Sequence, residues 1–142
     1  MSEKVAYKTL REKMARGLDR IDRVENAMLT GMPDVNYCIG GREGWIEIKY
    51  PTEPVRASTP LFGSSHKLSQ EQMNWLLRQH QAGGTAYILI VTDKRWILVD
   101  KLYADVINKL TLGEILQNCL WESSKPVKGE EPWNSLRLAL QQ

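Results

Sequence analysis

The chain has 142 residues and 42% of them are hydrophobic, so it is long enough to bury one core and fits a single domain. Nineteen basic residues nearly balance seventeen acidic ones, and the net charge of +2 excludes a protein that binds polyanions through bulk charge alone. Cys38 and Cys119 lack the spacing of a zinc site or a secreted disulfide framework, and no apolar run is long enough for a membrane span or a signal peptide. We therefore expect an intracellular, cytoplasmic protein.

The first regular element expected is an amphipathic helix from residue 7 to about residue 20. Leu10, Met14 and Leu18 recur at intervals of four, with charged residues between them. Residues 21–28 alternate less clearly and are compatible with a short strand. This part of the chain therefore predicts a helix followed by an extended segment.

Two strands, at residues 34–39 and 44–50, are predicted to form a hairpin through the turn at residues 40–43. The paired glycines in this turn can adopt the positive φ values that a tight connection needs. With a four-residue turn, Asp34 lies opposite Lys49. Because the turn is even-numbered, the two side chains share one face of the sheet.

The second strand of this hairpin carries Glu47 and Lys49 two positions apart. Side chains alternate along a strand, so these two project from one face while Ile46 and Ile48 project from the other. The hairpin register adds Asp34 to the polar face. The sequence thus predicts two carboxylates and one ammonium on the same side of one sheet.

A long segment rich in proline, glycine and serine follows at residues 51–67 and contains Arg56, His66 and Lys67. Loops of this length in a compact domain often bind something. A basic loop directly after the strand with the charged residues is suited to contact phosphates. The alternative is that these three residues only keep the loop soluble.

The remaining elements are marked by their caps and by their apolar runs. A helix begins after Ser69, a good N-cap, and ends at Gly83-Gly84. A buried run then predicts a central strand with an antiparallel partner. The later elements expected are strands at 85–91 and 96–99, helices at 102–110 and 112–120, a polar linker at 122–132 and a short segment at 133–140.

The charged face of the hairpin has the composition of a phosphodiester-cleaving centre. Asp34, Glu47 and the backbone carbonyl of Ile48 offer the oxygen ligands that Mg²⁺ prefers. A metal ion can activate water and stabilise charge on phosphoryl oxygens, and the ammonium of Lys49 can orient that water or neutralise the transition state. The spacing therefore predicts a metal-assisted hydrolytic site.

These residues resemble the PD-(D/E)xK nucleases, whose motif appears as Pro33-Asp34 and Glu47-Ile48-Lys49. The segment 68–76, followed by Gly83-Gly84 and an apolar strand, is similar to the glutamine-bearing helix of the virus-type replication-repair nuclease domain (VRR-NUC), a branch related to archaeal Holliday junction resolvases. The resemblance covers residues 7–99.

The resemblance implies an α/β fold with a restriction-endonuclease-like core of a helix, a three-stranded meander, a helix and a strand, extended by C-terminal helices. The nuclease domain would span residues 1–121, with the core at about 7–99 and a helical addition at 100–121. Residues 122–142 would form a linker and a short C-terminal segment.

The resemblance also implies a Mg²⁺-dependent DNA endonuclease, with Mn²⁺ as a substitute, that hydrolyses phosphodiester bonds in branched DNA as Holliday junction resolvases do. Such an enzyme would act in DNA recombination and repair, and as a homodimer, because symmetric cutting of a four-way junction needs two sites related by a two-fold axis. A phage or mobile-element origin is a further hypothesis, which the expectation of a small stand-alone domain would favour. The alternatives are a nicking, flap, end-processing or restriction-type nuclease, and a non-catalytic DNA-binding module on the same fold.

Carried over to this chain, the family's roles assign metal binding to Asp34, Glu47 and the carbonyl of Ile48. Lys49 would serve catalysis, and Gln72 would support the site from the second helix. A non-catalytic member would be free to lose one of the charged residues, so the presence of Asp34, Glu47 and Lys49 together favours an enzyme.

The carboxylate that the first helix often supplies in this family has three candidates. Glu12 is the best placed, because it lies within the predicted helix, whereas Glu25 is on the less certain strand and Glu3 stays open. Arg23 is either a phosphate contact beside the site or a salt-bridge partner of Asp22 or Glu25. With Arg23, the DNA-binding candidates include the three basic residues of the long loop.

Overall fold

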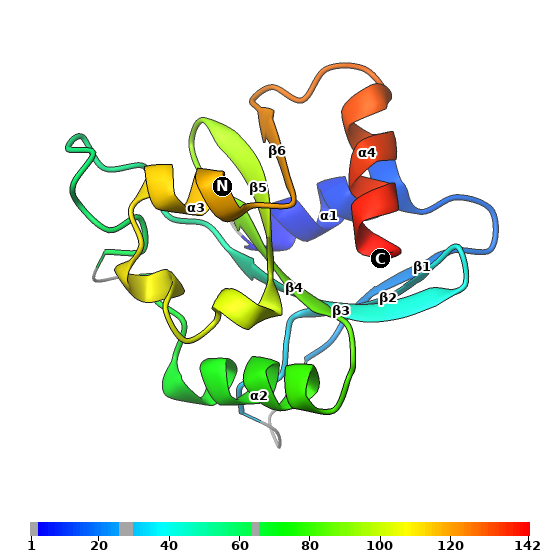
Figure 1. Cartoon of the computed structure of the whole chain (residues 1–142). Helices are drawn as coiled ribbons and strands as arrows, with labels where there is room; N and C mark the ends of the chain where they lie inside the picture. The colour runs from blue at the N-terminus through cyan, green and yellow to red at the C-terminus, as the bar shows by residue number, and fades with distance from the viewer. Residues whose placement is uncertain (1–2, 26–29, 64–65) are drawn as a thin grey trace.

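The computed structural model describes residues 3–25, 30–63 and 66–142. Its centre is a six-stranded mixed sheet in the order β1-β2-β3-β4-β5-β6 (Figure 1). The strands are β1 (Arg20–Arg23), β2 (Val35–Ile39), β3 (Arg42–Lys49), β4 (Ala86–Val91), β5 (Arg95–Asp100) and β6 (Trp121–Ser124). The helices are α1 (Glu3–Met14), α2 (Gln70–Gln81), α3 (Leu112–Asn118) and α4 (Glu131–Leu140), with short 3₁₀ turns η1 (Lys101–Tyr103) and η2 (Ile107–Lys109).

The connections follow the chain order along the sheet. Strands β1, β2 and β3 form an antiparallel meander, β3 and β4 are parallel, and β5 and β6 are antiparallel to their neighbours. Parallel neighbours cannot be joined by a tight turn, and α2 lies on the crossover between β3 and β4. The expected helix, three-stranded meander, helix and strand are confirmed.

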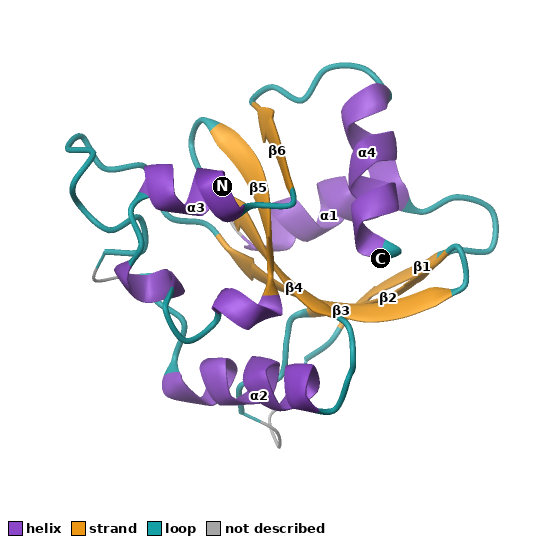
Figure 2. Cartoon of the chain, viewed as in Figure 1, coloured by secondary structure: helices purple, strands orange, loops and turns teal. Residues whose placement is uncertain are grey.

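Helices cover both faces of the sheet and create two hydrophobic layers (Figure 2). One layer lies under α1 and α4, where Leu10, Met14 and Leu136 are buried against the sheet. The other lies under α2, α3 and the 3₁₀ turns, where Leu76 and Ile115 are buried. Helix α2 therefore packs on the sheet face opposite α1. The first turns of both helices approach the same end of β3, because Gln72 of α2 contacts Glu47 and Glu3 of α1 contacts Asp34.

The predicted helix at residues 7–20 is wrong at both ends. Helix α1 begins at Glu3 and ends at Met14, and its buried stripe includes Ala6 besides the two expected residues. Leu18 is fully exposed, and Gly17 adopts a positive φ of 57° after the helix has ended. The earlier start places Glu3 in the first turn, which matters for the site. The possible strand at 21–28 is β1, and residues 26–29 lie outside the described residues.

The hairpin has a shorter turn than predicted. Ile39 pairs with Arg42, so the turn contains only Gly40 and Gly41, which both have positive φ. The register therefore differs by two residues from the predicted one, and Asp34 is level with Glu47 instead of Lys49. Because the shift is even, the polar side chains keep their common face.

The C-terminal part differs more from expectation. The predicted linker at 122–132 is wrong at its start, because β6 pairs with β5 and extends the sheet. Helix α4 follows and buries Trp133 and Leu140 in the core shared with α1. The helix expected at 102–110 is replaced by the two 3₁₀ turns, whereas α3 confirms the next one. Within the described ranges, no helix combines the length and the apolar character needed to cross a bilayer.

Candidate active site

The first turn of α2 positions Gln72. Ser69 caps the helix in a capping box, in which its hydroxyl accepts from the Gln72 backbone N–H at 3.1 Å and the Gln72 side-chain oxygen accepts from the Ser69 N–H at 2.9 Å. These contacts leave the amide nitrogen of Gln72 directed at strand β3, where it donates to Oε2 of Glu47 at 3.3 Å. One side chain therefore both begins the helix and holds Glu47.

The segment that carries Asp34 lies directly on the same helix. Gly31 has a φ of 87°, and a Cβ at this position would lie 2.3 Å from the backbone oxygen of Glu71. Only glycine permits this approach without a shift of the backbone. The Gly31-Met32-Pro33-Asp34 segment thus reaches the site because residue 31 has no side chain.

Asp34 is fixed by the neighbouring strand. Its Oδ2 accepts a hydrogen bond from the backbone N–H of Ile48 at 2.9 Å. Asp34 raises the pKa of Glu47 through charge repulsion and then through a side-chain hydrogen bond between the two carboxyl groups. The hairpin therefore brings the two predicted carboxylates together.

Glu47 is the least usual residue of the site. It is only 2% exposed, and its Oε1 is buried without a hydrogen-bond partner among the described residues. Burial first, and then the charge of Asp34, raises its pKa well above the ordinary value, while the ammonium of Lys49 acts in the opposite direction. A buried carboxyl group with one unsatisfied oxygen is costly unless a cation or a proton compensates it.

The carboxylate contributed by α1 is Glu3. Its pKa is raised by burial and then by Asp34, while Arg23 lowers it through an ion pair of 3.4 Å. Glu12 is exposed and lines a separate cavity beside Trp133, so the structure does not bring it to the other carboxylates. Of the three candidate glutamates, the structure therefore brings Glu3 to Asp34 and places Glu12 elsewhere.

Glu3 was one of the open alternatives, and a signal in the sequence favours it. The apolar interval of four extends backward from Met14 through Leu10 to Ala6. Following the stripe in this direction starts the helix one turn earlier and places Glu3 in its first turn. The third candidate, Glu25, has a largely exposed side chain and pairs with Arg23.

Lys49 lies close enough to Glu47 to lower the pKa of that carboxyl group. Its Nζ donates to the backbone oxygen of Lys67 at 3.3 Å, so the ammonium also touches the end of the long loop. The strand, the carboxylates and the loop therefore meet at one end of β3.

The four residues that were predicted to contact DNA lie at different places in the structure. Arg23 pairs with Glu3 and Glu25, as its structural alternative predicted, while Asp22 pairs with Arg20. Arg56 and Lys67 are exposed on the loop. His66 is half-buried, and its ring packs against Tyr50 with the centroids 5.0 Å apart. The structure thus places Arg23 beside Glu3, His66 beside Tyr50, and the backbone of Lys67 beside Lys49 at the end of β3.

The donor set fits a hard divalent cation. Within the described ranges, no group of three or more histidine, cysteine or acidic side chains is arranged so that it could hold a metal ion. Mg²⁺ does not need one, because it binds through one or two carboxylates, waters and substrate phosphate. The unsatisfied Oε1 of Glu47 and the repulsion that Asp34 exerts on Glu47 and Glu3 are relieved by a positive charge. We infer that the two carboxylates of Asp34 and Glu47 would hold Mg²⁺ or Mn²⁺.

The architecture is a restriction-endonuclease-like α/β fold. Among solved structures, the chain is similar to Hjc of Archaeoglobus fulgidus, a Holliday junction resolvase from an archaeal hyperthermophile, with a TM-score of 0.54 and 18% sequence identity over 81% of this chain and 89% of that chain. No protein-family model matches the chain, and no curated protein matches it. The expected fold class is confirmed.

Gln72 makes two side-chain contacts, one with Ser69 in the capping box and one with Glu47, and two substitutions distinguish their effects. Gln72→Glu keeps the acceptor of the capping box but places a negative charge against Glu47, whereas Gln72→Ala removes both contacts. We expect both variants to lose about 10–100-fold in DNA cleavage, and only Gln72→Ala to lose about 1 kcal/mol of stability in metal-free protein at pH 5. Cleavage rates and urea unfolding test this. Equal cleavage by wild type and Gln72→Glu would contradict the role of the amide.

Proposed function

We propose that the protein is a Mg²⁺- or Mn²⁺-dependent endonuclease that hydrolyses phosphodiester bonds in DNA. The observation that carries this proposal is Glu47, a buried carboxyl group with one unsatisfied oxygen, which is held by Gln72 and lies against Asp34. Two carboxyl groups buried side by side are costly unless a proton or a cation compensates them, and a cation would also satisfy the unpaired oxygen of Glu47. The presence of Lys49 on the same strand supports a catalytic role over a binding role.

In the proposed reaction, each residue of the site has a separate role. Asp34, Glu47 and the carbonyl of Ile48 would hold the cation, and Gln72 fixes the orientation of Glu47. When bound, the cation supplies Lewis-acid activation of water and stabilises charge on the phosphoryl oxygens. The ammonium of Lys49 orients the attacking water and neutralises charge that develops on the phosphate. Because Lys49 contacts the carbonyl of Lys67, DNA that enters the site competes with this contact.

We propose branched DNA as the substrate. Support comes from the fold shared with a Holliday junction resolvase and from the small net charge, which suits recognition of shape at one face better than sliding along duplex. Symmetric cutting of a four-way junction requires a homodimer with two sites. Membership of the VRR-NUC branch is supported by the capped helix that carries Gln72. A role in DNA recombination and repair follows from this substrate.

A panel of substrates tests the proposal. Labelled four-way junction, flap and linear duplex are incubated with Mg²⁺, Mn²⁺ or EDTA, using wild type, Asp34→Asn and Lys49→Ala. We expect junction cleavage that requires metal and is lost in both variants. Cleavage that survives EDTA or either substitution would overturn the mechanism. Preferred cleavage of flaps would show that the substrate is a flap and not a four-way junction. Tight junction binding without cutting would indicate a non-catalytic module.

A further inference from the structure

Three positively charged residues form a stripe along the exposed side of α1. Lys4, Lys8 and Arg11 follow one another at intervals of four and three, which places them in one row on the helix surface. All three are exposed, and none forms an ion pair or a hydrogen bond through its side chain within the described part of the chain. Glu12 is exposed four residues after Lys8, and no ion pair joins these two described side chains. The stripe therefore presents unpaired positive charge.

The stripe begins beside the proposed metal site. Lys4 directly follows Glu3, which contacts Asp34 and keeps 28% of its side chain exposed. Tyr7 lies next to the first and last residues of the stripe, at intervals of three and four. Its hydroxyl donates to the backbone oxygen of Ile21 in β1 at 3.3 Å. This contact fixes the rotation of α1, so the stripe runs along the β1 side of the helix and leads away from Glu3.

The buried side of α1 argues against a membrane as the partner of the stripe. A helix that lies on a bilayer inserts an apolar face between the lipids. The apolar face of α1 is already used in the core, where Ala6, Leu10 and Met14 are fully buried. The partner is therefore a polyanion bound through charge, and the proposed substrate carries a phosphate at every nucleotide. Because the net charge of the chain is only +2, such binding depends on a local cluster of this kind.

The length of the stripe matches a short run of phosphates. A helix rises by about 1.5 Å per residue, so Lys4 and Arg11 are about 10 Å apart along the axis. The phosphates of one strand of duplex DNA follow at about 3.4 Å along its axis. The stripe therefore spans about three nucleotides, and its first residue is the one nearest the carboxylates.

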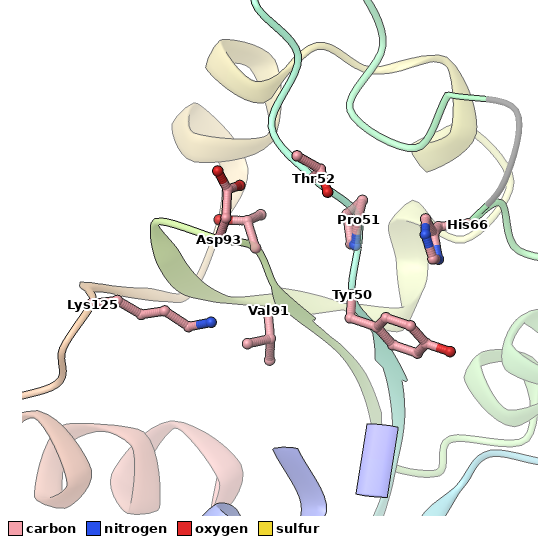
Figure 3. A pocket seen from close by; sticks show the side chains of 8 residues that line it. Tyr50, Pro51, Thr52, His66, Val91, Asp93 and Lys125 are labelled. Carbon is pink, nitrogen blue, oxygen red and sulfur yellow. The ribbon is translucent and has the colours of Figure 1, made fainter. Parts of the chain in front are cut away.

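A cavity at the ends of β3 and β4 does not offer the same concentration of positive charge (Figure 3). Among the described residues that line it, Asp93 opposes the charge of Lys125. Figure 3 shows Lys125 and His66 on opposite sides of Tyr50 and Pro51, so the two cannot hold one small anion together. Contacts with several successive phosphates are therefore expected along α1 and not in this cavity.

We propose that Lys4, Lys8 and Arg11 form a track for the backbone of the DNA strand that is cut. The track would hold phosphates within about four nucleotides on one side of the cleaved bond. The proposal rests on the proposed function, because the cut strand has to pass the carboxylates beside which the track begins. Contacts of this kind position the strand and do not read its sequence.

Binding of DNA in EDTA, followed by fluorescence anisotropy at several salt concentrations, tests the track without chemistry. Lys8→Gln and Arg11→Gln remove charge at a distance from Glu3. Lys13→Gln is the matched control, because Lys13 is exposed on the same helix but lies beside Trp133 of α4. We expect the first two variants each to bind about 5–10-fold more weakly at about 0.1 M salt and to reduce the salt slope by about 1. Lys8→Arg and Lys13→Gln should stay within about twofold of wild type, and thermal unfolding checks that each variant is folded.

Neutral methylphosphonate groups, placed one at a time along the strand, then locate the contacts. We expect positions within about four nucleotides on one side of the cut to weaken wild type but not the double variant Lys8→Gln/Arg11→Gln. Equal binding by the double variant and Lys13→Gln, or no such positions, would overturn the track while metal-dependent cleavage stands. Binding that depends on Lys8 and Arg11 in a protein that never cleaves DNA would support the track and overturn the proposed enzyme. Weaker binding of the double variant to anionic lipid vesicles, with unchanged binding to DNA, would assign the stripe to a membrane surface and overturn the proposal.

Discussion

Glu47→Gln is expected to reduce DNA cleavage by at least about 10³-fold, because it removes a ligand worth several kcal/mol of transition-state stabilisation. The same substitution should make the metal-free protein more stable at neutral pH. It removes a buried carboxyl group that Asp34 repels, and the introduced amide can donate to Asp34. We expect Tm to rise by roughly 2–8 °C in EDTA, as about 1–2 kcal/mol produces in a domain of this size.

The pH dependence of stability has a defined sign. The pKa values of Glu47 and Glu3 are raised above the ordinary 4.5, so the native protein binds more protons than the unfolded chain above that value. The stability that these protons provide is fully present below about pH 4.5 and is lost as pH rises through the raised pKa values. In EDTA, wild type should lose more stability than Glu47→Gln between pH 5 and 8.

Thermal unfolding at several pH values, beside cleavage rates, measures both effects. Glu12→Gln is the matched control, since it changes an exposed glutamate on the same protein and should alter neither quantity. A Glu47→Gln variant that cuts DNA at the wild-type rate would remove Glu47 from the site. A variant that is inactive but less stable than wild type in EDTA at pH 8 would contradict the strained carboxyl pair.

The second large effect is expected for Glu3→Gln. Glu3 contacts Asp34 from the first turn of α1 and pairs with Arg23, so its loss alters the charge and position of Asp34, the carboxylate that we propose as a metal ligand. We expect cleavage to fall by about 10–100-fold at limiting Mg²⁺, which is typical for a group that orients a metal ligand. Glu12→Gln should stay within about twofold of wild type.

Varying the Mg²⁺ concentration distinguishes a role at the metal from general damage. A site role predicts that excess Mg²⁺ restores part of the activity of Glu3→Gln, with far-UV circular dichroism unchanged. The reverse order, a large loss in Glu12→Gln and none in Glu3→Gln, would show that the carboxylate from α1 has been chosen wrongly.

The sequence predicted the polar face correctly because side chains in a strand repeat every two residues. The turn at Gly40 and Gly41 is two residues shorter than expected, yet an even error leaves Asp34 and Glu47 on one side of the sheet. An error in the position of a helix boundary is not cancelled in this way. Leu18 fitted the interval of four, but the helix had already ended, and this moved the expected glutamate to the wrong turn.

Two further features depend on contacts between distant segments. Strand β6 has a polar sequence, and it is an edge strand whose hydrogen bonds to β5 decide its conformation, so the segment resembles a linker in isolation. The close approach of Gly31 to Glu71 is likewise set by packing and not by local preference.

Calorimetric titration with Mn²⁺ at pH 7 tests the central claim, that Asp34 and Glu47 form a cation site. Wild type and Asp34→Asn are titrated in two buffers of different ionisation enthalpy, so that the number of protons released is measured with the affinity. We predict saturable binding by wild type with net proton release, because the cation displaces the proton that the raised pKa of Glu47 retains, and loss of this binding in Asp34→Asn. Absence of saturable binding, or equal binding by Asp34→Asn, would contradict the account.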